Sequence, residues 1–119
     1  MNQPTNLFFN EDVIAEMRET ITLYSRAEVF FFGITNKESD KVESVYAASF
    51  GTRRSVAMLH DNCFSDCMIH NHPSGNLIPS ESDIEIAALI GKNSFIINNE
   101  ATLVRVICKH RKNNFDYFW

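Results

Sequence analysis

Cysteine, proline and glycine are all scarce in this sequence, and each shortage excludes a class of protein. Three cysteines among 119 residues cannot all pair, which argues against a secreted scaffold held by disulfides. Three prolines and four glycines leave no stretch that resembles a low-complexity linker. No apolar run approaches the roughly 20 residues that a membrane helix needs, and no charged-then-apolar leader is visible. The expected compartment is therefore a reducing cytoplasm.

The charge balance is acidic, which argues against nucleic acid as a partner. Eleven basic and fifteen acidic residues give a formal net charge of −4, whereas non-specific binding to nucleic acid depends on neutralising phosphates. Two short basic stretches, Arg53–Arg54 and Lys109–Lys112, are each better explained as solvated surface. Neither nucleic acid nor a membrane is an expected partner.

Apolar residues are abundant enough to form a packed core. Hydrophobic residues make up 45% of the sequence, and ten residues are phenylalanine. A chain of this length suits one domain of ordinary size. We therefore expect a single domain that spans residues 1–119.

Hydrophobic periodicity predicts helices interleaved with strands. Asn10, followed by Glu11 and Asp12, is typical of a helix start, because asparagine can cap the first turn and acids suit that end of the helix dipole. The first helix then carries an apolar stripe formed by Val13, Ile14, Met17, Ile21 and Tyr24. Further helices are predicted over residues 52–59 and 80–92, and strands over residues 28–32, 42–50, 65–71, 95–97 and 103–108. This order predicts an α/β fold, a layered α-β-α domain with a mixed sheet flanked by helices.

The stretch from His70 to Asp83 carries the clearest chemical signal. Alternate residues of a strand point to the same face, so His70 and His72 can converge on one ion. The loop that follows returns the chain to a helix whose first turn holds Asp83, and this carboxylate can supply a third ligand. Two nitrogens and one oxygen favour zinc and leave a fourth position open for water, as in catalytic rather than structural sites.

Ser80 and Asp83 also have a purely structural interpretation. A serine followed three residues later by an acid is typical of a capping pair at a helix N-terminus, and a single histidine near a strand is usually structural. The spacing from two alternating histidines favours the metal site. Ser80 can cap the helix and face the metal at the same time.

Together these residues resemble the signature of the JAMM (MPN+, JAB domain) zinc metalloproteases. That signature is H-x-H, seven residues, then S-x-x-D, and it is matched without a gap by His70, His72, Ser80 and Asp83. The segment from residue 70 to residue 75 is most similar to the RadC-type branch of the family. The resemblance implies a cytidine-deaminase-like JAB/MPN fold in which zinc is held by His70, His72 and Asp83.

The resemblance also implies a catalytic glutamate upstream, on the first strand. Glu28 fits best, because it stands directly before the apolar run Val29–Phe32. The competitors are Glu11, Glu16 and Glu19 on the first helix, and, more weakly, Glu38 and Glu43. In this scheme zinc activates a water, Glu28 transfers its proton, and Ser80 stabilises the oxyanion. The expected function is zinc-dependent hydrolysis of a peptide or isopeptide bond, on a peptide or on a ubiquitin-like or sulfur-carrier protein.

Three alternatives stay open. Cys63 and Cys67 could join the two histidines in a closed structural zinc site. The domain could instead be a non-catalytic binding module in a DNA-repair or defence assembly, because the RadC-type branch has been linked to DNA repair. The C-terminal tail is most often expected to pack on its own domain but also allows a homo-oligomer; its aromatic residues are Phe115, Tyr117, Phe118 and Trp119.

Overall fold

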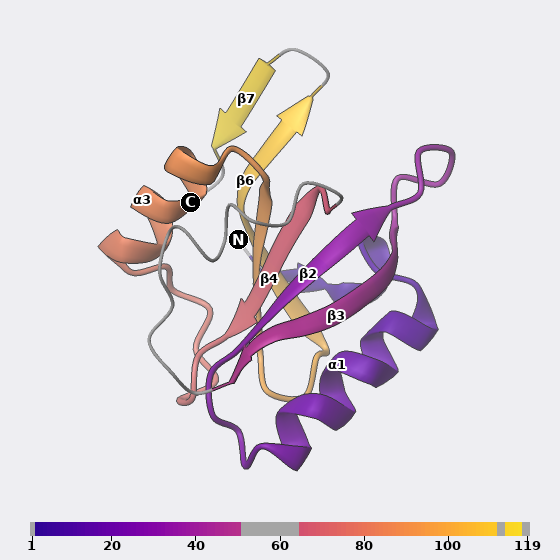
Figure 1. The fold of residues 1–119 in the computed structure, drawn as a ribbon, viewed down its shortest axis with the longest axis vertical. Coiled ribbons are helices and arrows are strands. Elements are labelled where there is room, and N and C mark those ends of the chain that lie inside the picture. The colour runs from indigo at the N-terminus through magenta and orange to yellow at the C-terminus, as the bar shows by residue number, and fades with distance from the viewer. Residues whose placement is uncertain (1, 51–64, 112–113, 118–119) are drawn as a thin grey trace.

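One mixed sheet organises the domain (Figure 1). The computed structural model describes residues 2–50, 65–111 and 114–117. Within them the strand order is β1-β6-β5-β4-β2-β3, and β7 also pairs with β6. The strands are β1 (Gln3–Pro4), β2 (Val29–Thr35), β3 (Val42–Phe50), β4 (Cys67–Asn71), β5 (Asn93–Ile97), β6 (Leu103–Arg111) and β7 (Asn114–Tyr117). Among these pairs β4 and β5 run parallel and the others antiparallel.

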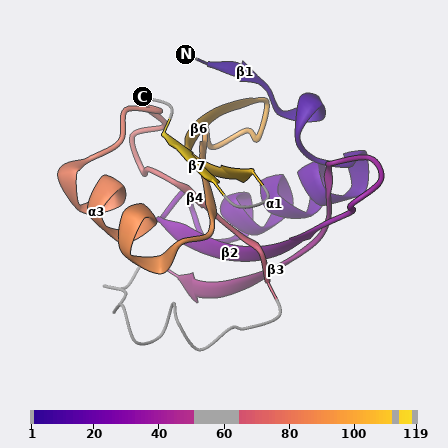
Figure 2. The ribbon, with the colours of Figure 1, turned by 90° about the horizontal axis from the view of Figure 1, so that it is seen from above.

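Two helices cover opposite faces of this sheet, as Figures 1 and 2 show. Helix α1 (Glu11–Leu23) buries its apolar stripe in a cluster with residues of β2, β4, β5 and β6. Helix α3 (Glu81–Ile90) covers the other face, where Ala87 packs with Ile96 and Ile107. The predicted α/β fold, with a mixed sheet between helical layers, is confirmed.

Strand alternation decides which side chains of β4 reach which helix. Cys67 and Ile69 belong to the cluster under α1, whereas Met68 packs with Phe30 on the α3 face. By the same alternation His70 points to the α3 face. Antiparallel pairing sets Phe30 opposite His70. Glu28, two residues before Phe30, therefore stands near the end of β4.

Several expectations about element ends need correction. Asn10 is the N-cap of α1, but its side chain makes no capping hydrogen bond; instead Asp12 Oδ1 accepts one from the Val13 N–H at 3.0 Å. Tyr24 is 41% exposed because the helix ends at Leu23, one residue before the apolar stripe would have continued. Helix α3 ends at Ile90 rather than near residue 92, because Gly91 adopts a left-handed conformation with φ 75°.

Long-range pairing adds elements that local patterns did not indicate. Strand β1 pairs with the start of β6, and a 3₁₀ turn (Thr5–Leu7) follows it. Strand β7 pairs with the end of β6, so this part of the tail extends the chain's own sheet. The helix predicted over residues 52–59 lies outside the described residues. In the described part of the chain, neither helix has the length and apolarity to cross a membrane.

Gly33, in the middle of β2, leaves no room for a larger side chain. A Cβ there would lie 2.7 Å from Cys67 Sγ and 3.2 Å from the carbonyl oxygen of Ser44. Intrinsic strand propensity favours alanine over glycine, but a buried thiol and a backbone carbonyl have little room to yield.

We expect Gly33→Ala to lower the free energy of unfolding by about 1–3 kcal/mol, because overpacking outweighs the gain in propensity. Urea unfolding followed by circular dichroism measures the loss. Ile34→Val, at the partly exposed neighbouring position, is the matched control and should change stability by less than about 0.5 kcal/mol. An unchanged or higher stability of Gly33→Ala would contradict the packing described here.

Candidate metal centre

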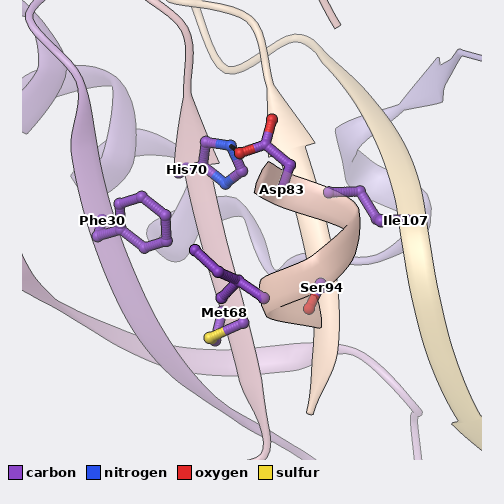
Figure 3. Close-up of a pocket in the computed structure, with 7 residues that line it drawn as sticks. Phe30, Met68, His70, Asp83, Ser94 and Ile107 are labelled. Carbon is purple, nitrogen blue, oxygen red and sulfur yellow. Dashed lines mark ion pairs between the residues drawn. The ribbon is translucent and has the colours of Figure 1, made fainter. Parts of the chain in front are cut away.

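The end of β4 and the start of α3 meet at one point of the α3 face. Gly75, with φ 81°, makes a tight turn in which its N–H donates to the His72 carbonyl at 2.8 Å. This turn directs the chain back toward the sheet, so that α3 begins beside the strand it follows. Figure 3 shows the imidazole of His70 and the carboxylate of Asp83 turned toward each other across this junction.

Asp83 lies between two imidazoles. Its Oδ1 is 3.2 Å from His70 Nε2, and its Oδ2 is 2.9 Å from His72 Nε2. His70 and Asp83 are buried, at 4% and 5% exposure, while His72 is half-buried. The two histidines predicted to share a face therefore converge on the predicted carboxylate.

A capping box fixes the orientation of this carboxylate. The Asp83 N–H donates to Ser80 Oγ at 3.0 Å, and the Ser80 N–H donates to Asp83 Oδ2 at 2.9 Å. Oδ2 thus accepts from the backbone of the N-cap while it contacts His72. The structural interpretation of Ser80 and Asp83 and their place in the site are therefore compatible.

The surroundings of Asp83 keep it ionised. Burial by itself would raise the pKa of this carboxyl, but its interactions with His70 and His72 outweigh burial and hold the pKa well below its usual range. On the inner side a small apolar pocket is lined by Phe30, Met68 and Ile107, as Figure 3 shows. The ring of Phe30 stacks on His70 with centroids 4.6 Å apart, which holds the imidazole plane.

His72 makes hydrogen bonds through both ring nitrogens. Its Nδ1 lies 3.1 Å from the carbonyl oxygen of Asn76, which can only accept, so Nδ1 carries the proton. In a neutral ring Nε2 then presents a lone pair to the Asp83 carboxylate. Two acceptors at 2.9 Å repel unless a proton or a metal cation lies between them. The hydrogen bond with Asp83 raises the pKa of His72, and the hydrogen bonds with Asn76 add to this rise despite burial.

Glu28 also reaches this junction. One carboxylate oxygen of Glu28 and one ring nitrogen each of His70 and His72 all lie within 4.8 Å of one another, close enough to hold a metal ion. On the outer side an open cleft of about 400 Å³ exposes the site, and its lining includes Glu28, Ser80 and Asp83. All five residues predicted from the sequence therefore gather at one place, while their individual roles stay predictions.

These donors fit zinc. Zinc takes imidazole nitrogens and carboxylate oxygens as ligands, and both histidines lie beside the carboxylates of Glu28 and Asp83. The second ring nitrogen of His72 bonds to a carbonyl, which is the usual support for a zinc-bound histidine. Sequence reasoning did not identify Asn76, because its role depends on how the loop places a backbone carbonyl.

The structure removes Cys67 from the alternative, closed zinc site. Cys67 is fully buried in the cluster under α1, on the face of the sheet opposite to His70. Burial raises the pKa of its thiol, which keeps it protonated and inert. Cys63 lies outside the described residues.

An α-β-α domain in which two histidines at a strand end face an aspartate at the next helix start is typical of the JAB-type domains. The chain belongs to the RadC-like JAB domain family, whose model matches residues 10–100. No curated protein matches the sequence. Among solved structures, the chain is similar to the solution structure of a protein from Salinibacter ruber, with 18% identity over 92% of this chain and 87% of that chain and a TM-score of 0.53. At this identity the likeness concerns the fold alone.

We expect Ser80→Ala to destabilise the metal-free protein by about 1 kcal/mol, because the Asp83 N–H loses its acceptor, whereas Ser80→Gly should cost only a few tenths. Urea unfolding in the presence of a chelator measures both. Ser82→Ala, at an exposed position of the same turn, is the control and should not destabilise. Equal stability of Ser80→Ala and the wild type would mean that the capping box contributes nothing.

Proposed function

We propose that this domain is a zinc-dependent hydrolase that cleaves a peptide or isopeptide bond with an activated water. The observation that carries the proposal is the convergence of Glu28, His70, His72 and Asp83 at the edge of an open cleft. Membership of the RadC-like JAB family supports the same chemistry. A buried carboxylate between two imidazoles is an expensive arrangement for a surface that only binds a partner.

The ligands in this proposal are His70, His72 and Asp83. Asp83 contacts both imidazoles and is held by the capping box, so it is the more rigid of the two carboxylates. Glu28 stands just before β2 and lines the open cleft, which places it beside a substrate in that cleft. When bound, zinc supplies a water of lowered pKa and polarises the substrate carbonyl.

Glu28 and Ser80 have separate tasks in the reaction. Glu28 accepts the proton of the attacking water and later returns it to the leaving amine. Ser80 Oγ already accepts a hydrogen bond from the Asp83 N–H, so its own hydroxyl proton can be donated to an oxyanion in the cleft. Ser80 therefore acts as a hydrogen-bond donor and not as a nucleophile.

The cleft suits an extended chain. It is open to solvent, and Ile78 at its edge is 69% exposed, which offers apolar contact to a substrate side chain. A short peptide or the C-terminal tail of a ubiquitin-like or sulfur-carrier protein is the substrate class we propose. The acidic net charge of −4 argues against nucleic acid in this cleft.

We expect the purified protein to bind one zinc ion per chain, His70→Ala to bind almost none, and Glu28→Gln to retain the wild-type content. The physical reason is that the first variant removes a ligand, whereas the second removes only the proposed base. Inductively coupled plasma mass spectrometry after dialysis measures the content. Loss of zinc from Glu28→Gln would make Glu28 a ligand and would refute its assignment as the base.

Chelation should abolish hydrolysis of a fluorogenic peptide library, added zinc should restore it, and serine-directed reagents should leave it unchanged. Hydrolysis depends on the metal, while Ser80 never forms a covalent intermediate in this scheme. Rates before and after treatment with chelator and with phenylmethylsulfonyl fluoride check both statements. Zinc binding without any hydrolysis would contradict the proposed hydrolase and favour the non-catalytic alternative.

A further inference from the structure

Behind the metal centre, on the opposite face of the sheet, lies a buried pair of amides. Asn71, between the two histidines, is fully buried, and Asn99, in the turn between β5 and β6, is 6% exposed. Asn71 Nδ2 donates to Asn99 Oδ1 at 2.8 Å. Asn99 Nδ2 in turn donates to the carbonyl oxygen of Pro73 at 3.1 Å.

The same pair holds the backbone on both sides of Glu28. Asn71 Oδ1 accepts from the Val29 N–H at 2.8 Å, and Asn71 Nδ2 also donates to the Ala27 carbonyl at 3.1 Å. The pairing of β2 with β4 ends at Phe30 opposite His70. Side-chain hydrogen bonds therefore continue the connection between the strands to the point where Glu28 stands.

In the hydrogen bonds of Asn71 and Asn99, the donor and the acceptor are fixed by their partners. Because Asn71 Oδ1 must accept from a backbone N–H, its Nδ2 must donate to the two oxygens that it faces. The chain of hydrogen bonds thus runs from Ala27 and Val29 through Asn71 and Asn99 to Pro73, the residue after His72. Buried and fully directed bonds of this kind specify one geometry, because any displacement leaves a polar group unsatisfied.

We infer that Asn71 and Asn99 are positioning residues that set the Glu28 carboxylate at its working distance from His70 and His72. This inference rests on the proposed function for its catalytic meaning. Neither amide lines the cleft, so both act through the backbone of residues 27–29 and 73. Displacement of a base by about 1 Å can cost on the order of 100-fold in rate.

The test compares Asn71→Ala and Asn99→Ala with Asn98→Ala. Asn98 occupies the same turn, and its side chain bonds locally, to Thr102 and Leu103. We expect kcat on the peptide library to fall about 10- to 100-fold in the first two variants, with one zinc retained and KM changed less than about threefold. Asn98→Ala should retain the wild-type kcat.

Each substitution is repeated in the Glu28→Gln background. If the two asparagines only stabilise the structure, their removal should lower the rate there by the same factor as in the wild type. If Asn71 and Asn99 act through Glu28, their removal there should lower the residual rate by less than about twofold, since the effects are not independent. An equal fold-loss in both backgrounds, or an unchanged kcat in both single variants, overturns the inference.

Hydrogen exchange of the Val29 amide gives a readout that needs no activity. Its protection should fall at least tenfold in Asn71→Ala and several-fold in Asn99→Ala, and should stay unchanged in Asn98→Ala. If the zinc-loaded wild type hydrolyses nothing, the proposed function fails, and this exchange pattern still decides whether the amide pair fixes residues 27–29. Unchanged protection in both variants overturns the inference. Because Asn71→Ala removes a buried network and could fail to fold, Asn99→Ala carries the same test with a smaller disruption.

Discussion

The placement of one buried carboxylate between two imidazoles is the constraint on which the rest of this site depends. Asp83 joins the first turn of α3 to the end of β4, and it is both the N3 residue of a capping box and the partner of both histidines. Taking such a charge out of water is costly unless each oxygen is paired. The helix start and the strand end must therefore keep one relative position, and the tight turn at Gly75 allows it.

The layers give the two sides of this junction different environments. Toward the interior, Phe30, Met68 and Ile107 exclude water and strengthen every electrostatic interaction of Asp83. Toward solvent, Glu28 and Ser80 line the open cleft. A metal held at this boundary would be rigidly liganded on one side and accessible on the other, which is what hydrolysis with an activated water requires.

The opposite face of the sheet contributes to the same site. The pleat sends the side chain of Asn71 to the α1 face of the sheet, while its neighbours His70 and His72 lie on the α3 face beside Asp83. One strand can therefore present two histidines on one face and hold the segment that precedes β2 from the other. In our proposal the distance of Glu28 from His70 and His72 is therefore set by hydrogen bonds on the opposite face of the sheet.

Local chemistry made much of this protein predictable from its sequence. The face shared by His70 and His72 follows from the two-residue period of a strand, and the contact of Ser80 with Asp83 follows from helix capping, so both could be predicted without the fold. Glu28 was indicated by family resemblance. Its proximity to the histidines comes from antiparallel pairing of β2 with β4, which no local pattern encodes. Tertiary structure alone decided the hydrogen bonds of Asn71, Asn76 and Asn99 and the pairing of strands β1 and β7, because these bonds form only when separate segments meet.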